Sequence, residues 1–276
     1  MKAVCPICPH HCSLEEGAAG LCGARHNQDG QVVSDTYGQL TSLALDPIEK
    51  KPLRRFFPGT FILSVGSAGC NMHCPFCQNH EISMPGPGLH TEYLSPAALA
   101  ELAQRLAARQ AGNLGAAFTY NEPVVSYEYV LAAARELHSR GLRTVLVTNG
   151  MIAPEPLARL LPFVDAMNID LKGFSADYYH WLGGDLKAVQ AAIVQSAANC
   201  HVEVTTLILP GKNDGEAEMA AEAQWLAALS PELPLHISRF FPRHQLLELP
   251  ATPVETIRHL CSTAGKYLRW VYAGNC

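Results

Sequence analysis

The chain has 276 residues, 48% of them apolar and 16% charged, which is enough to bury a large core as one large domain or two small ones. Lysine and arginine number 20 against 25 aspartates and glutamates, so the formal charge of −5 argues against a basic surface for nucleic acid. No apolar run approaches the roughly 20 residues that cross a bilayer, and no secretion signal opens the chain, so we expect a cytoplasmic protein without a membrane segment.

Ten cysteines in a reducing compartment indicate metal sites and not a disulfide framework. Residues 1–30 have little periodic apolar character and contain four of these cysteines: Cys5, Cys8, Cys12 and Cys22. Such a segment does not fold around its own core, so we predict that the four thiolates hold it together around a metal. Zinc and an iron–sulfur cluster both suit the spacing, and His10 or His11 can replace one thiolate.

The rest of the chain divides into a predicted linker, residues 31–58, and a repetitive region, residues 59–276. The linker consists of polar turns and ends in basic residues expected at the surface, solvated or in contact with an anionic partner: Lys50, Lys51, Arg54 and Arg55. In the repetitive region, β-rich runs alternate with amphipathic helical segments, which is the pattern of βα units around a parallel sheet. We expect strands at 61–65, 116–120, 144–148, 164–170, 202–209, 235–240 and 269–272, and helices that begin at Pro96 and Pro123 and others near 154–161, 185–198, 215–229 and 253–266.

A polar or glycine-bearing loop follows each of the first six predicted strands. Because the sites of βα folds are built from the loops at the carboxyl ends of strands, these loops are expected to meet at one mouth. Periodicity alone does not distinguish an open, doubly wound sheet from a full or partial barrel.

The loop after the first of these strands carries three closely spaced cysteines, Cys70, Cys74 and Cys77, and the next cysteine in the chain is Cys200. Structural zinc and ordinary electron-transfer clusters close their coordination with four protein ligands, so three thiolates indicate a position left open for chemistry. His73 as a fourth zinc ligand is disfavoured, because it is the sequence neighbour of Cys74 and simultaneous chelation of one ion would be strained.

The spacing Cys-x3-Cys-x2-Cys, with Phe76 before the last cysteine, resembles the signature of the radical S-adenosylmethionine (SAM) superfamily. The resemblance implies that the three thiolates hold a [4Fe–4S] cluster whose fourth iron binds the amino and carboxylate groups of SAM. It further implies reductive cleavage of SAM to a 5′-deoxyadenosyl radical that abstracts a hydrogen atom, with no side chain acting as acid or base. The implied fold is a partial (β/α)6 TIM-like barrel, here with a small cysteine-rich N-terminal extension.

Within that superfamily the chain resembles the glycyl-radical-enzyme activases, such as the pyruvate formate-lyase activating enzymes. It is more similar to the radical SAM enzyme of the AmmeMemoRadiSam system, through the segments 46–53 and Thr119-Tyr-Asn-Glu-Pro123. Val147 stands where the activases carry an aspartate that helps to hold a monovalent cation, which argues against that cation here. The resemblance gives candidate SAM or substrate contacts: Phe76, Asn121, Glu122, Thr148, Asn149, Asp170 and Lys172. Two further candidates, His236 and Arg239, are chosen because they lie on the sixth predicted strand near the mouth.

The partners implied by the resemblance are SAM, a one-electron donor such as flavodoxin or ferredoxin, and a glycyl radical enzyme or another protein as the hydrogen donor. A small molecule as the hydrogen donor stays open at this point. A second class of function also stays open: a zinc-binding adaptor or redox sensor in which both cysteine sets hold zinc and SAM is not turned over.

Overall fold

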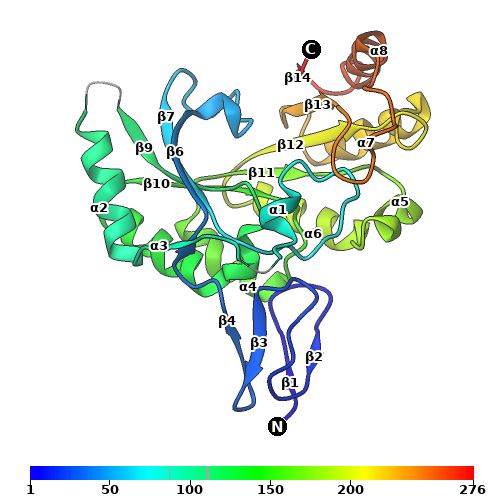
Figure 1. Cartoon of the computed structure of the whole chain (residues 1–276). Helices are drawn as coiled ribbons and strands as arrows, with labels where there is room; N and C mark the ends of the chain where they lie inside the picture. Colours follow the sequence, from blue (N-terminus) through cyan, green and yellow to red (C-terminus); the bar gives the residue numbers. More distant parts are fainter. Residues whose placement is uncertain (87, 110–111) are drawn as a thin grey trace.

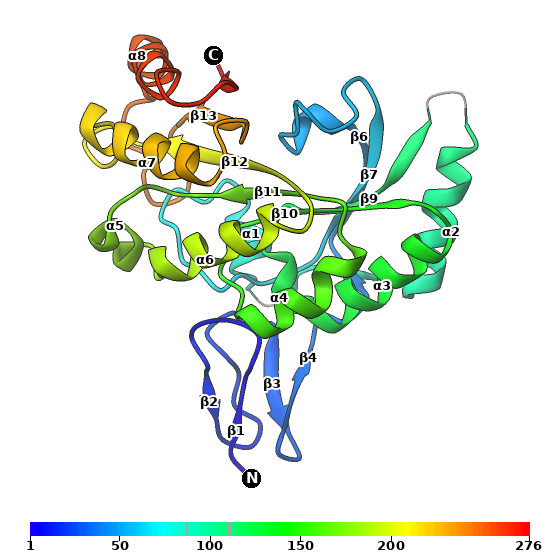
Figure 2. The same ribbon diagram turned by 180° about the vertical axis from the view of Figure 1, so that it is seen from behind.

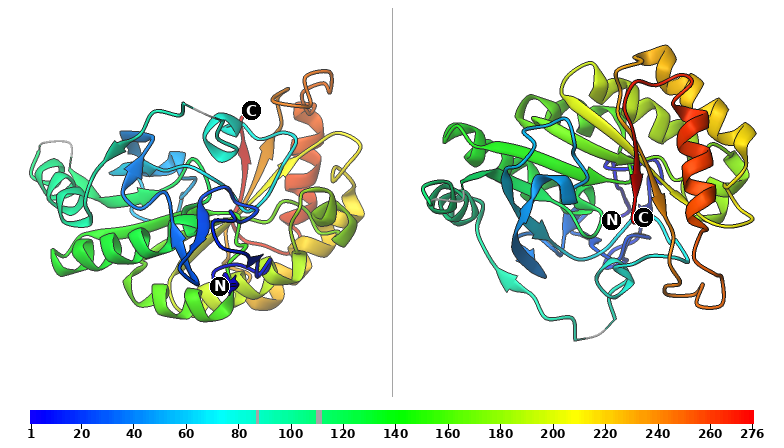
Figure 3. Two further views of the ribbon diagram at one scale, coloured as in Figure 1. Left: turned by 60° about the horizontal axis from the view of Figure 1, so that its bottom comes forward. Right: turned by 90° about the horizontal axis from the view of Figure 1, so that it is seen from above.

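The computed structural model describes residues 1–86, 88–109 and 112–276, and an eight-stranded sheet forms its centre (Figure 1). The strand order is β14-β13-β12-β11-β10-β9-β7-β6, and every neighbouring pair is parallel except β6 and β7. Figure 3 shows the sheet curving, with the helices on its outer side. The parallel strands are β7 (Phe61–Gly66), β9 (Asn113–Phe118), β10 (Arg143–Thr148), β11 (Ala166–Asp170), β12 (His201–Ile208), β13 (Leu235–Arg239) and β14 (Val271–Gly274).

Helices connect the parallel strands and cover the convex face of the sheet (Figure 2). The predicted helix starts are confirmed where proline or a capping side chain marks them. The hydroxyl of Ser95 accepts a hydrogen bond from the amide of Ala98 at 3.2 Å, directly before Pro96. The helices are α1 (His80–Ser83), α2 (Pro96–Ala107), η2 (Pro123–Ser126), α3 (Tyr127–Ser139), α4 (Pro154–Leu160), η3 (Leu161–Phe163), α5 (Ala176–Trp181), α6 (Leu186–Ala197), α7 (Glu216–Leu229) and α8 (Val254–Ala264). No helix in the described ranges is long and apolar enough to span a membrane.

Two apolar clusters occupy the two faces of the sheet. The larger cluster takes alternate strand residues such as Leu63 and Leu146 and packs them against the helices. The residues next to these along the strands point to the opposite, concave face, because side chains alternate along a strand. There the strand residues Ile62, Ala117, Val145 and Ala166 form a smaller cluster. Three side chains from the segment just before β7 complete it: Ile48, Leu53 and Phe56.

The prediction that residues 31–58 form a linker is wrong. The segment contains β5 (Gln39–Leu40), the strand β6 (Ser42–Pro47), which pairs antiparallel with β7, and the 3-10 turn η1 (Ile48–Lys50). Strand β6 escapes recognition because its leucines, Leu43 and Leu45, are exposed while its polar residues lie at least partly buried.

Lys51, predicted at the surface as part of a basic run, is buried instead. Its ammonium donates to Asp46 Oδ2 at 2.9 Å, and the same carboxylate accepts from Ser64 and from the hydroxyl of Tyr120. Burial alone would raise the pKa of Asp46, but these hydrogen bonds hold it well below its ordinary value. The pair is therefore an ion pair within the fold and not a contact surface for a partner.

Two short hairpins at the N-terminus project from the α/β body, as Figure 1 shows in blue. They consist of β1 (Ala3–Val4) with β2 (Ser13–Leu14), and β3 (Arg25–Gln28) with β4 (Gln31–Ser34). The expected boundary at residue 30 cuts through the turn of the second hairpin. Arg25, 2% exposed, fastens this hairpin to the body through bonds of 2.6 and 2.7 Å to the carboxylate of Glu128.

The buried carboxylate of Glu203 holds the segment before β7 against the strands. It accepts hydrogen bonds from the amides of Arg54 and Arg55 at 3.0 and 2.7 Å, and from the rings of His201 and His236 at 3.0 and 2.6 Å. Burial alone would raise the pKa of Glu203, but the histidine and amide donors lower it from 4.5 to about 2.

We predict that Glu203→Ala lowers the free energy of unfolding by about 3 kcal/mol at pH 7, because it leaves buried donors without an acceptor. The exposed carboxylate of Glu155, which pairs with Arg159 on α4, gives the control Glu155→Ala, expected to cost less than about 1 kcal/mol. The depressed pKa means that the stabilisation is present above pH 4.5 and is lost as the pH falls toward 2. Urea denaturation at several pH values measures both effects, and equal losses for the two variants would contradict the prediction.

Candidate active site

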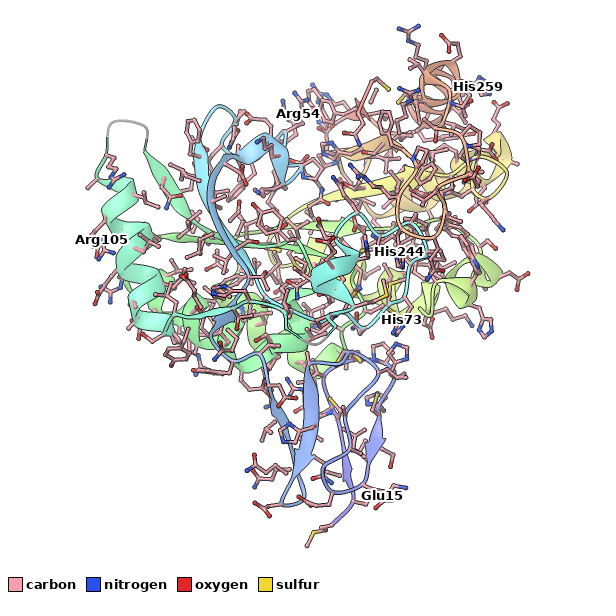
Figure 4. All side chains as sticks on the ribbon, viewed as in Figure 1. Glu15, Arg54, His73, Arg105, His244 and His259 are labelled. Carbon is pink, nitrogen blue, oxygen red and sulfur yellow. The ribbon has the colours of Figure 1, made fainter. Side chains whose placement is uncertain are left out.

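The three central cysteines lie in the loop that leaves the carboxyl end of β7. Backbone hydrogen bonds fix this loop to segments far away in sequence: His73 N–H donates to Leu182 O at 2.9 Å, and Gln245 N–H donates to Pro75 O at 2.9 Å. In Figure 4, His73 is labelled between the N-terminal hairpins and the body. The loop is thus held from both sides of the mouth by the connections after α5 and β13.

Asn121 fixes the start of the cysteine loop. Its side-chain oxygen accepts from the amide of Ser67 at 3.0 Å, and its side-chain nitrogen donates to Gly69 O at 2.9 Å. The preceding residue, Tyr120, has a φ of +73°, an uncommon value for a bulky side chain, and its carbonyl accepts from Asn79 at 2.7 Å. Asn121 is a predicted contact of the cofactor, and in the structure its side-chain amide shapes the loop that carries Cys70.

Glu122 is 2% exposed and joins two neighbouring loops. Its Oε1 accepts from the hydroxyl of Thr148 at 2.7 Å and from the amide of Val124 at 3.2 Å, and its Oε2 accepts from the amide of Asn149 at 2.7 Å. Burial raises the pKa of Glu122 to about 7, against the effect of these donors. Oε2 keeps a lone pair for a further donor, so the predicted contact of Glu122 with SAM is compatible with this network.

Asn149 links this network to the first cysteine. Its side-chain nitrogen lies 3.6 Å from the sulfur of Cys70 and 2.9 Å from the side-chain oxygen of Asn71. The side-chain nitrogen of Asn71 in turn donates to Met151 O at 2.7 Å. Asn71 was not predicted from the sequence. The only sign of its role in the sequence is its position directly after Cys70, the first cysteine of the motif.

Asp170 and Lys172 form an ion pair at the end of β11, with 2.5 Å between the ammonium and the carboxylate. Burial alone would lower the pKa of Lys172, but Asp170 raises it above its ordinary value, so the lysine stays charged. Burial raises the pKa of Cys74 to about 11, and the Lys172 ammonium acts against this rise. The pair therefore lies close to the second cysteine, and the carboxylate of Asp170 keeps part of its surface open.

Three other predicted contacts already have partners within the protein. Phe76 is buried, and its ring centre lies 6.3 Å from that of Trp181. His236 donates from Nε2 to Glu203, as described above, and Arg239 donates from Nε to Thr252 O at 2.5 Å. Phe76 thus lines the cysteine loop with apolar surface, while contacts of His236 and Arg239 with SAM stay predictions.

The donor set fits a [4Fe–4S] cluster better than a single ion. In the described part of the chain, no three or more His, Cys, Asp or Glu side chains form a group arranged to hold a single metal ion, and this includes Cys70, Cys74 and Cys77. A cluster takes each thiolate on a different iron and leaves its fourth iron for another ligand. Asn149 lies beside Cys70, and Lys172 with its partner Asp170 lies close to Cys74.

We predict that Asn149→Ala shifts the midpoint potential of the iron-loaded protein to a more negative value, on the order of tens of millivolts. The reason is that an N–H donor near a ligating sulfur stabilises the reduced, more negative cluster. Asn199→Ala is the matched control, because the side chain of Asn199 donates only to Gln195 O on the surface. Spectroelectrochemical titration measures the shift. Identical potentials for both variants would show that the contact between Asn149 and Cys70 does not affect the midpoint potential.

Comparison with known proteins places the chain in a family. The model of the radical SAM superfamily matches residues 64–223. The uncharacterised protein MJ0808 of Methanocaldococcus jannaschii is 39% identical over 99% of this chain and 81% of its own length. The isethionate sulfite-lyase activating enzyme of Nitratidesulfovibrio vulgaris is 29% identical over 48% of this chain and 43% of its own length.

Two solved structures share the fold. A radical SAM methyltransferase from Sphaerobacter thermophilus aligns with a TM-score of 0.59 at 19% identity, over 79% of this chain and 67% of that chain. A domain of a pyruvate-formate lyase-activating enzyme from Bacteroides vulgatus aligns with a TM-score of 0.50 at 19% identity, over 58% of this chain and 99% of that domain. The predicted fold class is confirmed, and the chain belongs to the radical SAM superfamily.

Proposed function

We propose that this radical SAM enzyme takes a hydrogen atom from a residue of a partner protein, with a glycyl radical enzyme as the leading candidate. When bound, the cluster supplies the electron that cleaves a C–S bond of SAM, which yields methionine and a 5′-deoxyadenosyl radical. The support is the similarity to an activating enzyme, whose name describes action on another protein. A flavodoxin or ferredoxin is the proposed electron donor.

The charged side chains at the mouth suit the methionine part of SAM. Lys172 has an ammonium for the SAM carboxylate, and Asp170 has a carboxylate for the SAM amino group. Because the two are already paired at 2.5 Å, each side chain is held at the mouth with its charge compensated before SAM binds. Glu122 acts beneath them by holding Thr148 and Asn149 in place.

The observation that favours a macromolecular substrate is an exposed apolar rim on the loop after β13. This loop touches the cysteine loop through the bond from Gln245 to Pro75 O. Two of its side chains project into solvent, Phe241 at 46% and Leu247 at 64% exposure. Exposed apolar side chains beside a reaction site are typical of a surface that receives a protein partner.

We predict that deuterium moves from a partner protein into 5′-deoxyadenosine. The assay combines the reconstituted enzyme, SAM, dithionite and a purified glycyl radical enzyme that carries deuterium at its glycine α-carbons. Mass spectrometry of the nucleoside is expected to show deuterium, and electron paramagnetic resonance to show a glycyl radical on the partner. Unlabelled 5′-deoxyadenosine formed with every protein tested would overturn the protein substrate and leave the radical chemistry intact.

We further predict that Leu247→Ser raises the KM for the partner about tenfold or more, because the loss of a buried leucine contact costs roughly 1.5–3 kcal/mol. The affinity for SAM is expected to stay unchanged, since the Leu247 side chain is 64% exposed and the SAM contacts proposed above come from other loops. Leu229→Ser provides the matched control, a leucine of 38% exposure at the end of α7. A similar KM for both variants would remove the rim from the proposal.

A further inference from the structure

Two local features bring the four N-terminal cysteines together: a hydrogen-bonded loop and a turn. The amide of Cys5 donates to Cys12 O at 2.9 Å, which closes the loop that carries Cys8. The fourth cysteine, Cys22, lies in the turn before β3. A Cβ atom built on Gly20 would lie 3.8 Å from the sulfurs of both Cys12 and Cys22, so those sulfurs are near neighbours.

All four thiols line one cavity at the junction of the hairpins and the α/β body. Apart from the sulfurs, the wall is mostly aliphatic and comes partly from the body, including Val124 and Val125 at the start of the η2 helix. The other lining residues are Ile7, His10, Leu14, Gly20, Leu21, Arg25 and Asn71. Four thiols around an apolar cavity form a set of potential metal ligands, and metal is what such a set binds.

The candidate histidines are not needed as ligands. The ring nitrogen Nε2 of His10 lies 2.8 Å from Asn71 O, and since a carbonyl only accepts, this nitrogen carries the proton. His11 does not line the cavity; its φ of +42° shapes the turn before Cys12. The four thiols suffice as a complete set of four ligands, so the other ring nitrogen of His10 is not required.

The arrangement favours a cluster over zinc. A zinc ion requires its sulfurs about 2.3 Å from one point, so a zinc site converges tightly. Within residues 1–86, 88–109 and 112–276 no such convergence of three or more ligands occurs, and the four N-terminal thiols share this property with Cys70, Cys74 and Cys77. Thiols that surround a cavity instead of a point match the separate iron corners of a cluster.

We propose that Cys5, Cys8, Cys12 and Cys22 bind a second [4Fe–4S] cluster, closed by four protein ligands and adjacent to the SAM site. The two centres are in direct contact through the backbone, because the amide of Cys70 donates to Cys22 O at 3.3 Å. The cavity also reaches the SAM site through Asn71, which follows Cys70 in the chain. This assignment does not depend on the protein substrate proposed above.

The test counts iron, sulfide and zinc after anaerobic reconstitution with ferrous iron and sulfide. The variant Cys70→Ala/Cys74→Ala/Cys77→Ala removes the SAM site and is expected to keep roughly four iron atoms and four sulfides per chain. The variant Cys8→Ala/Cys12→Ala is expected to lose the second cluster and keep the first, with the perturbation of its paramagnetic resonance spectrum by SAM preserved. Cys200→Ala/Cys261→Ala is the matched control and is expected to hold both.

The unmodified chain gives a decision even where a variant fails to fold, as judged by circular dichroism. Roughly eight iron atoms per chain, with a Mössbauer spectrum of two [4Fe–4S] clusters, support the proposal. Roughly four iron atoms with one tightly held zinc overturn it in favour of a zinc site. Four iron atoms with no further metal overturn it as well.

Discussion

The buried carboxylate of Glu122 is the interaction on which the site depends. It holds the turn after β10 against the start of the η2 helix, and so places Asn149 next to the sulfur of Cys70. Burying a carboxylate is costly unless donors surround it, and here three protein donors do so. Without this carboxylate, the turn after β10 would lose the hydrogen bonds of Thr148 and Asn149 that hold it against the start of η2.

The parallel half of the fold follows from local sequence pattern. Strands β7 and β10 to β13 and helices α2 to α4 and α6 to α8 lie within a few residues of the predicted positions, because apolar runs and helix-opening prolines mark them. Strand β6 could not be predicted in this way. Its burial pattern is inverted, with Leu43 and Leu45 exposed, and its place is set by Asp46, whose partners Lys51, Ser64 and Tyr120 are recognisable only after folding.

The site shows the same division between local pattern and long-range contact. Cysteine spacing alone predicts two candidate sets of metal ligands, since ligand geometry restricts the distance between ligands along the chain. The roles of Asn121 and Asn71 depend on hydrogen-bond partners 52 to 80 residues away in the sequence. A local sequence pattern does not predict such partners. A motif residue that similarity assigns to cofactor binding can therefore act by positioning a ligand-bearing loop, as Asn121 does for the loop before Cys70.

The chemistry proposed for this site requires that three thiolates leave one iron open and that SAM occupies it. The most direct measurement is electron–nuclear double resonance on the reduced, reconstituted protein with SAM that carries 15N in its amino group. We expect a clear nitrogen coupling to the cluster, which disappears when SAM is left out. A fully loaded, reduced cluster that shows no coupling to labelled SAM at saturating concentration would contradict the account.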